Sequence, residues 1–421
     1  MKKLLFLAAN YPPYMNHGAL RAFNVASNLP HYGWKPFVIA PPDLQPPFQG
    51  MGAGSETLIC RTGEAFNARG LDHDSIALFL RGGMIPAGGV AARVLPRIFS
   101  APHPLSTWEK QASALAEEII QTEGSIEGIY VQGPPAAAVS LALDLSQKHS
   151  LPVLFDLTAP LDQPGSAALP SAVRESDLQK LEERVLTSGY PVITPTRALK
   201  EYFLKKYFGR TAHSDISIIP DTALPLPMAI AKAGASFRPV IFLEGLDSEE
   251  MRLLFSSLAA FLQGHASLGS SMAIVVVTAE IQAARKLAKK YRIGDSVELR
   301  SAKSAGEEVE LALGGDVVGL VSGSAEPCRL RVPDPLLIAV GLGRPVFALG
   351  PDGAGKQFSV ESGGMHLDGG GDGAPREMLQ LCFERWRQGT LSSSKSQLPE
   401  RCRPERVFRD LGKIIAFMLP V

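Results

Sequence analysis

Two short phrases in the first half of the chain bring together residues whose types and spacing could do chemistry. Tyr130–Pro135 reads as a buried strand broken by glycine and proline, and a later apolar run ends in Asp156. In an open parallel sheet, ligands bind outside the carboxyl ends of the strands, which is where Gly133 and Asp156 would lie. Asp156 could orient a substrate hydroxyl or act as a base, and Gly133 would leave room for a ligand. The alternatives are that Gly133-Pro134-Pro135 starts a helix and that Asp156 caps the following turn.

A second group of candidate residues follows the first apolar run of the chain. His17 and Gly18 stand in a loop before a helix, and Arg21 falls in the first turns of that helix. Gly18 permits close backbone approach, and the amide groups at a helix N-terminus favour a phosphate or a developing anion. Arg21 could reach the same anion with its fork of N–H donors, and His17 could contact a substrate. Gly18 could equally be a turn residue, and Arg21 a solvated helix residue.

These residues need a framework, and apolar runs alternate with helical segments along nearly the whole chain. The runs are continuous, which predicts parallel strands covered on both faces by helices. Strands are expected at residues 3–8, 36–40, 57–60, 128–132, 152–156, 191–194 and 216–219, and again at 240–243, 272–278, 296–299, 316–321 and 345–349. Helices are expected around residues 20–29, at 136–149 and after Trp108.

Length and pattern together predict two domains. A chain of 421 residues is too long for one ordinary core, and prolines interrupt the alternation between residues 223 and 238. The predicted class is α/β, with a Rossmann-like doubly wound domain over 1–222, a linker over 223–238, and a second such domain over 239–403 facing the first across a cleft. Residues 404–421 are expected to form a closing C-terminal helix.

Composition excludes several classes of function. Lysine plus arginine equal aspartate plus glutamate at 42 each, so no net positive charge attracts nucleic acid. No apolar stretch approaches the ~20 residues needed to cross a bilayer, and the first residues are expected to form a strand rather than a signal peptide. The four cysteines are scattered and the eight histidines are isolated. We therefore expect no metal site, no disulfide framework and a cytoplasmic location.

Residues 76–105 do not fit the alternation of strands and helices. An apolar run at 76–80 is followed by glycines, and then by apolar residues interleaved with Arg93 and Arg97. One interpretation is a set of helical segments packed on the first domain. The other is an arginine-flanked apolar surface that contacts the inner face of a membrane or a lipid-linked substrate.

The order of motifs resembles that of the family 4-like glycosyltransferases of GT-B architecture. Those enzymes commonly open with a strand, a Pro-Pro turn such as Asn10–Pro13, a glycine-containing loop and an arginine. Trp108, Tyr130–Pro135 and the strand ending in Asp156 are similar to the branch whose fifth strand carries Asp-x-Arg-Asp-Pro-Trp. The segments 194–196 and 218–221 also match in position. The resemblance extends over essentially the whole chain, is good over residues 1–220 and is thin after 240.

This resemblance implies transfer of a sugar from a nucleotide-sugar donor to a saccharide or lipid-linked acceptor, with retention and without a metal or other cofactor. A retaining enzyme needs electrostatic support for an oxocarbenium-like centre and a departing diphosphate. The resemblance assigns Asp156 and Arg21 to catalysis. It assigns substrate binding to six further residues, namely Gly18, His17, Gly133, Arg252, Glu326 and Lys356.

Departures from the family pattern leave other functions open. After Asp156 the expected arginine, second acid and tryptophan are absent, and Ile338 and Leu330 stand where acids that bind the sugar or ribose are expected. Isoleucine cannot accept hydrogen bonds from ribose hydroxyls, and the mainly acidic segment 244–252 would repel a diphosphate. The alternative is a catalytically inactive glycosyltransferase-like protein that acts as a binding partner or scaffold. A nucleotide-sugar epimerase is a third hypothesis.

The segment Gly350–Lys356 has the spacing of a phosphate-binding loop and follows an expected strand. Gln357 stands where Ser or Thr would hold Mg²⁺, so a nucleoside-triphosphatase loop is not expected. In the glycosyltransferase interpretation this loop borders the cleft, and Lys356 could still contact a phosphate.

Overall fold

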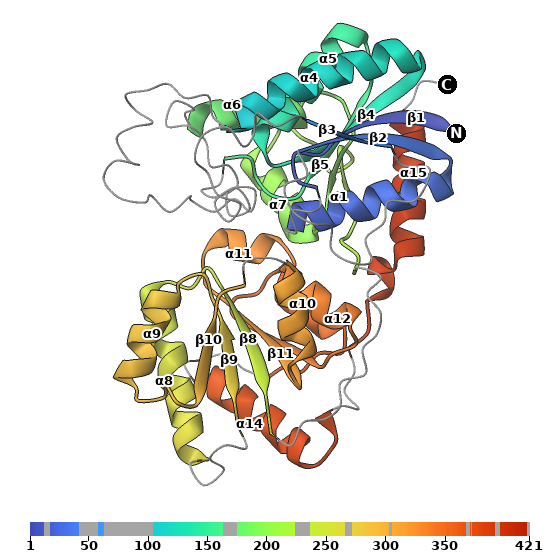
Figure 1. Ribbon diagram of the computed structural model, residues 1–421. Helices are drawn as coiled ribbons and strands as arrows, with labels where there is room; N and C mark the ends of the chain where they lie inside the picture. The colour runs from blue at the N-terminus through green and yellow to red at the C-terminus, as the bar shows by residue number, and fades with distance from the viewer. Residues whose placement is uncertain are drawn as a thin grey trace. The chain divides into compact units, whose positions relative to one another are not determined.

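The computed structural model describes residues 1–11, 17–41, 58–62, 104–162, 175–223, 236–265, 272–302, 305–367, 371, 373–391 and 396–418. The chain divides into two compact units, one formed by Met1–Asp221 with Pro404–Val421 and the other by Thr222–Arg403. Each unit contains one parallel sheet with helices on both faces (Figure 1). Most of the predicted linker, 223–238, lies outside the described residues.

Seven described strands form the sheet of the first unit, in the order β3-β2-β1-β4-β5-β6-β7. All of its neighbours pair in parallel. The strands are β1 (Lys2–Leu7), β2 (Trp34–Ala40), β3 (Leu58–Arg61), β4 (Ile126–Gly133), β5 (Val153–Leu157), β6 (Val192–Thr194) and β7 (Ile216–Ile218). The direction of winding reverses between β1 and β4, and ligands of doubly wound sheets bind at such a switch point.

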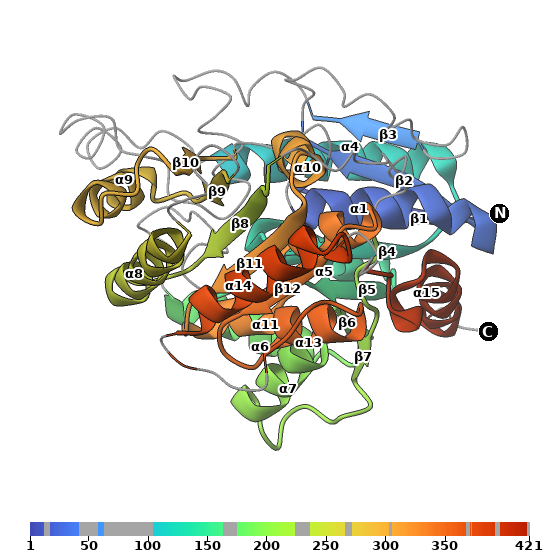
Figure 2. The same ribbon diagram turned by 90° about the horizontal axis from the view of Figure 1, so that it is seen from below.

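Helices cover both faces of the first sheet. They are α1 (His17–Asn28), the short turn η1 (Leu29–Tyr32), α4 (Pro104–Glu123), α5 (Ala136–His149), α6 (Glu175–Leu186) and α7 (Arg197–Lys206). α1 covers one face, while α4 and α5 cover the other, as the view from below shows (Figure 2).

Trp108 was expected before a helix, but it lies fully buried inside α4. The helix begins earlier, at Pro104, because proline is well tolerated in a first helical turn.

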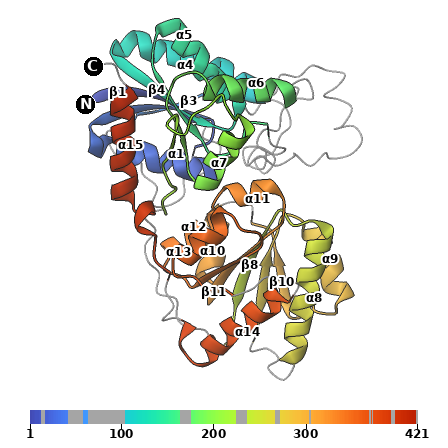
Figure 3. The ribbon, with the colours of Figure 1, turned by 180° about the vertical axis from the view of Figure 1, so that it is seen from behind.

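The last helix, α15 (Pro404–Met418), belongs to the first unit and not to the unit that precedes it in sequence. Figure 3 shows this red helix beside the blue strands of that unit. It buries an apolar face formed by Val407, Phe408, Leu411 and Ile415. The hydroxyl of Tyr32 also donates to the carbonyl of Glu405 at 3.1 Å. The N-terminal and C-terminal segments of the chain thus stabilise the same unit.

The second unit has five described strands in the order β10-β9-β8-β11-β12, so winding reverses between β8 and β11. The strands are β8 (Pro239–Glu244), β9 (Ile274–Val277), β10 (Val297–Arg300), β11 (Val317–Ser322) and β12 (Val346–Leu349). Its helices are α8 (Ser248–Gly264), α9 (Ile281–Lys290), α10 (Ala305–Leu313), α11 (Glu326–Leu330), α12 (Asp334–Gly341), α13 (Ala354–Glu361), α14 (Ala374–Arg387) and the short η5 (Glu400–Cys402). α8 and α9 lie on one side of the sheet, and α10 and α12 on the other (Figures 1 and 3).

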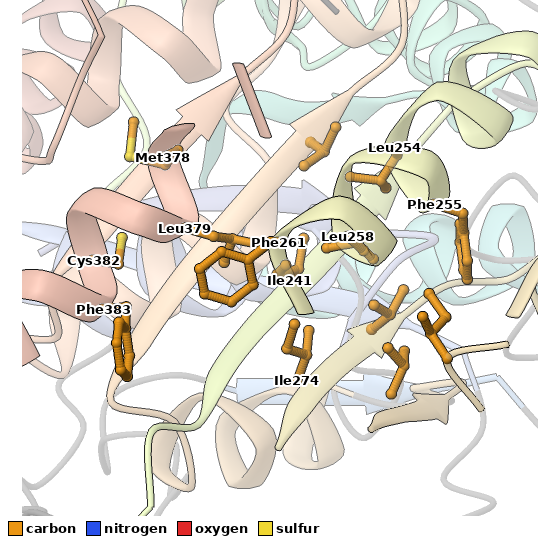
Figure 4. Packing of buried hydrophobic residues seen from close by; sticks show 14 of the residues in the cluster. Ile241, Leu254, Phe255, Leu258, Phe261, Ile274, Met378, Leu379, Cys382 and Phe383 are labelled. Carbon is orange, nitrogen blue, oxygen red and sulfur yellow. The ribbon is translucent and has the colours of Figure 1, made fainter. Parts of the chain in front are cut away.

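An apolar core joins α8 and α14 to the second sheet (Figure 4). Leu254, Leu258 and Phe261 from α8 meet Leu379 and Phe383 from α14 over the strands. These side chains are at most 3% exposed. The strands of the second sheet are therefore packed firmly against α8 and α14.

The predicted strands are all present, and their ends lie within two residues of the predicted ends. The helix predicted over residues 136–149 is α5, with the same bounds. The segment 76–103 lies outside the described residues, so its interpretation as a membrane-contacting surface stays a prediction. The arrangement of strands in two doubly wound sheets confirms the predicted α/β class.

Candidate functional site

The two residues predicted for catalysis meet in a buried charged network of the first unit. Arg21 comes from α1, Asp156 from the end of β5, and Asp221 from the segment after β7. The Arg21 Nε donates to Asp156 Oδ2 at 2.7 Å, and its Nη1 donates to Asp221 Oδ1 at 2.9 Å. The hydroxyl of Tyr130, on β4, donates to the same Asp156 Oδ2 at 2.5 Å. Four segments distant in sequence thus meet in one network.

Burial makes the electrostatics of this network strong. Tyr130 and Asp156 are 0% exposed, Arg21 is 6% exposed and Asp221 is 7% exposed. Burial by itself lowers the pKa of Arg21, but the carboxylates of Asp156 and Asp221 outweigh that effect and raise it. Burial, and then the charge of Asp156, raise the pKa of Tyr130 well above 10, so the phenol remains a donor. One guanidinium facing two carboxylates gives the network a formal charge of −1.

Some polar atoms at this edge have no hydrogen-bond partner among the described residues. They are Arg21 Nη2, Asp156 Oδ1 and both amide atoms of Gln132. Gln132 pairs with Asp156 in the ladder between β4 and β5, so both side chains lie on the same face of the sheet. Buried polar groups in proteins are nearly always hydrogen-bonded. Other buried polar atoms of the chain also lack a described partner, but here several of them belong to neighbouring segments at the switch point, which makes this edge able to hold a polar ligand.

The start of α1 is held tightly against the end of β1. A Cβ atom on Gly18 would lie 3.0 Å from Asn10 Nδ2, so glycine lets the helix approach the strand end. That Asn10 nitrogen donates to the carbonyl of Pro134 at 3.3 Å and links the segments that follow β1 and β4. The side chain of His17 lies outside the described part of the chain. Contacts of His17 and Gly18 with a substrate stay predictions.

The space left by Gly133 is used for packing. A Cβ atom there would lie 2.6 Å from Val139 Cγ2 and 3.2 Å from Leu157 Cδ2. Its carbonyl accepts from the backbone N–H of Thr158 at 2.8 Å and from the Thr158 hydroxyl at 3.2 Å. Gly133 thus positions α5 and the end of β5, and its predicted role in leaving room for a sugar stays a prediction.

A second buried cluster, which the sequence did not predict, holds the loop after β5. Lys206 Nζ donates to Asp162 Oδ2 and to Glu182 Oε1, both at 2.6 Å. Glu182 also accepts from the N–H of Leu161 at 2.5 Å and from the Tyr207 hydroxyl at 2.9 Å. Burial raises the pKa of Glu182 although these donors act to lower it. The cluster anchors the residues that directly follow Asp156.

At the switch point of the second unit, the acidic loop after β8 is tied to the loop after β11. Asp247 and Glu250 form a capping box at the start of α8, and Glu250 Oε1 accepts from the N–H of Ser324 at 2.7 Å. A Cβ atom on Gly323 would lie 2.1 Å from the carbonyl oxygen of Gly245. The two loops are therefore in direct backbone contact.

The substrate-binding residues predicted for the second unit are not brought together among the described contacts. Arg252 Nε donates to Glu249 Oε2 at 2.8 Å, and Glu326 is an exposed residue at the start of α11. Ile338 and Leu330, at positions expected to be acidic, are 2% and 7% exposed. They pack as core residues. The sequence did not predict the ion pair between Arg331 and Glu244, which lies at the end of β8.

Lys356 lies in the first turn of α13 and is paired with an acid of its own loop. Its Nζ donates to Asp352 Oδ1 at 2.9 Å, and Arg329 Nε donates to the carbonyl of Asp352 at 3.0 Å. A Cβ atom on Gly353 would lie 2.8 Å from the Arg329 Cα. The loop thus packs against α11. The side chain of Lys356 is 43% exposed.

Among the described residues, no group of three or more His, Cys, Asp or Glu side chains could hold a metal ion. No described helix has the length and apolarity needed to span a membrane.

Solved structures match the chain over nearly its whole length, whereas no family model and no curated protein matches the sequence. Sucrose-phosphate synthase of Thermosynechococcus elongatus is 15% identical, with 99% of this chain and 98% of that chain covered and a TM-score of 0.62. Anabaena HepE, solved with UDP-glucose, is 13% identical, with 99% and 100% covered and a TM-score of 0.60. A glycosyltransferase of Rickettsia africae is 12% identical, with 99% and 98% covered and a TM-score of 0.58.

The fold is GT-B. Because these matches cover 99% of the chain, they include both sheets, which are the two Rossmann-like domains of that fold. At identities of 12–15% the likeness shows the fold, so function must be argued from the residues at the sheet edges.

Sequence reasoning did not select Tyr130, Gln132 or Asp221 as site residues. Tyr130 and Gln132 alternate in the buried run Ile129–Gln132 of β4, and a polar residue inside a buried strand is a signal that could have found them. Asp221 carried no such signal, because its partner Arg21 is 200 residues away in sequence.

Proposed function

We propose that this protein is a glycosyltransferase that moves a sugar from a nucleotide-sugar donor to a saccharide or lipid-linked acceptor. The observation that carries the proposal is the whole-chain match to HepE, which has been solved with UDP-glucose and with UDP and glucose. The charged network at the switch point of the first sheet supports it, because polar side chains collect where this architecture binds ligands.

In this proposal Asp156 orients an acceptor hydroxyl through Oδ1. Its other oxygen is engaged by Arg21 and Tyr130, which hold the carboxylate in place. Arg21 offers its unpaired Nη2 to the reacting groups and supports developing negative charge. Transfer with retention, and without a metal or other cofactor, belongs to the same proposal.

Binding of the donor falls to the second unit in this proposal. Arg252 and Lys356 each pair with an acid close in sequence, and these ion pairs are solvent-exposed. Exposed ion pairs are weak, so a diphosphate could replace the carboxylate at either residue. Glu326, exposed at the start of α11, is proposed to bind the sugar or ribose hydroxyls.

We further propose that the reaction takes place in the cytoplasm, with residues 76–105 contacting the inner face of a membrane when the acceptor is lipid-linked. This part of the proposal rests on the sequence pattern of that segment. It predicts that anionic vesicles bind the full chain, and that a variant with Arg93 and Arg97 changed to serine binds them less.

The main test is thermal unfolding with a panel of UDP-, GDP-, ADP- and TDP-sugars, followed by a transfer assay with the stabilising donor. A ligand at 100 times its Kd adds about 2.7 kcal/mol to the stability of the folded state. One nucleotide class should raise Tm, and Lys356→Met should reduce that shift. The matched control is Lys413→Met, since Lys413 forms a similar exposed pair with Asp410 on α15 and should leave the shift unchanged.

The same experiment separates the rival functions. Absence of both a Tm shift and transfer, with broad donor and acceptor panels, would support the catalytically inactive binding partner. Conversion of a nucleotide sugar to its epimer without an acceptor would support the epimerase.

A further inference from the structure

Gln132 is a buried polar side chain whose amide atoms bond to none of the described residues of the first unit. It lies next to last in β4 and is 1% exposed, and neither its Oε1 nor its Nε2 has a hydrogen-bond partner among the described residues. Its direct neighbour in the ladder is Asp156, whose Oδ1 is also unpaired. Arg21, hydrogen-bonded to Asp156, also keeps its buried Nη2 without a partner among the described residues.

Gln132 does not serve the stability of the free protein. A buried amide that loses its bonds to water and gains none in the fold destabilises the folded state. Ser146 provides the contrast within the same unit. Its hydroxyl donates to the carbonyl of Leu151 at 2.7 Å and lies 2.9 Å from the Tyr190 hydroxyl, near the start of β5. Violations of local stability of the kind seen at Gln132 are typical of functional sites.

The unpaired atoms select a class of ligand. Asp156 Oδ1 and Gln132 Oε1 accept hydrogen bonds, while Gln132 Nε2 and Arg21 Nη2 donate them. A sugar hydroxyl both donates and accepts, so it satisfies such a mixed set. Phosphates and carboxylates only accept, and the formal charge of −1 on the network opposes them. Neighbouring strands lie about 4.8 Å apart, so one sugar ring can contact the side chains of both β4 and β5.

We infer that Gln132, together with Asp156 Oδ1 and Arg21 Nη2, binds adjacent hydroxyls of a neutral sugar and so selects the acceptor against anionic sugars. That this sugar is the acceptor rests on the proposed function. That a neutral sugar binds at this edge follows from the unpaired atoms alone.

The test compares Gln132→Met, which keeps the size of the side chain but removes its polar atoms, with Ser146→Ala. Probes are the methyl glycosides of glucose, galactose, mannose and N-acetylglucosamine, with glucose 6-phosphate as the anionic probe. Binding is followed by NMR titration of the full chain. Gln132→Met should raise the Tm of the free protein by a few degrees and weaken binding of the preferred methyl glycoside at least tenfold. Ser146→Ala should lower Tm and leave sugar binding unchanged.

The outcomes that overturn the inference are specific. The first is a wild-type protein that binds none of the methyl glycosides or that prefers glucose 6-phosphate. The second is a Gln132→Met variant that has a lower Tm than the wild type or that keeps full affinity for the sugar. If Gln132→Met fails to fold, Gln132→Leu takes its place, and failure of both shows a structural role and overturns the inference as well.

Failure here is distinguishable from failure of the proposed function. If the protein transfers a sugar and Gln132→Met keeps the wild-type KM for the acceptor, this inference falls and the proposed function stands. If no donor is bound or turned over but methyl glycoside binding depends on Gln132, the sugar site stands and the proposed function falls.

Discussion

The carboxyl edges of the two sheets use charge in opposite ways. In the first unit, Arg21 and Asp156 are buried, and each keeps a polar atom that bonds to no described residue. In the second unit, Glu250 spans two loops through the backbone N–H groups of Asp247 and Ser324. Lys356 pairs there with Asp352 in its own loop. The first edge therefore gathers several unpartnered polar atoms on neighbouring segments, whereas the second edge engages most of its charges internally and leaves Glu244 Oε2 without a described partner.

This difference predicts different responses to a ligand. A ligand at the first edge gains hydrogen bonds without displacing any, since the unpaired atoms of Gln132 and Asp156 belong to paired positions on neighbouring strands. A diphosphate at the second edge must compete with carboxylates that already hold the cations, as at Arg252 and Lys356. The first edge is thus pre-organised for its ligand, and pre-organisation lowers the free-energy cost of binding.

Arg21→Ala should have the largest effect and should confine it to the first unit. It leaves Asp156 and Asp221 buried without their counter-charge, which typically destabilises a protein by about 3–5 kcal/mol. Urea unfolding followed by tryptophan fluorescence reports this loss, because two of the three tryptophans, Trp34 and Trp108, are buried in the first unit. Transfer activity should be lost as well.

Thiol labelling reports unfolding of the second unit separately, because three buried cysteines lie there, namely Cys328, Cys382 and Cys402. In Arg21→Ala these thiols should stay protected at the urea concentration that unfolds the first unit. The control Arg252→Ala removes an exposed pair of the second unit and should leave both signals at their wild-type midpoints. An unchanged fluorescence midpoint in Arg21→Ala would show that the buried network does not stabilise its unit.

Gly323→Ala should have an intermediate effect, confined to the second unit. The added methyl group would meet the Gly245 carbonyl at 2.1 Å and the Glu250 Oε2 at 2.7 Å. Such overpacking usually costs about 1–3 kcal/mol, and earlier exposure of the Cys328 and Cys382 thiols in urea would report it. In the control Gly264→Ala, nothing lies within 4 Å of the new methyl group, so the thiols should be exposed no earlier than in the wild type. Equal effects of the two substitutions would contradict the direct contact between loops.

Local pattern was sufficient to predict the fold. Buried parallel strands are marked by continuous apolar runs, and proline or glycine breaks separate them, so even β6 (Val192–Thr194) could be placed from sequence. Trp108 could not be placed correctly, because the start of α4 depends on Pro104 and on packing rather than on periodicity. Helix ends are generally less well determined by sequence than strand interiors are.

The sequence predicted those site residues whose position follows from where a strand ends or a helix begins. Asp156 was placed at the sheet edge because a strand ends there, and Arg21 because a helix begins nearby. Their ion pair joins residues 135 positions apart in sequence, and that with Asp221 spans 200 positions. Such pairings are set by the register of β4 with β5 and by the position of α1 on the sheet. The cluster around Glu182 was missed for a different reason, because acids and lysines at helix positions are normally interpreted as solvated residues.

Glu250→Gln should have the smallest effect on stability and should bring the two edges closer in behaviour. The amide keeps one of the two acceptor bonds to the loops, and loss of an acid near a helix N-terminus costs roughly 0.3–1 kcal/mol. Removing the negative charge also reduces repulsion of a diphosphate, so the Kd of the stabilising nucleotide sugar should fall a few-fold. Titration calorimetry measures this, with Glu405→Gln in the first turn of α15 as the matched control. If Glu250→Gln weakens nucleotide binding instead, the link between the two loops is itself required by the donor, and the second edge is pre-organised after all.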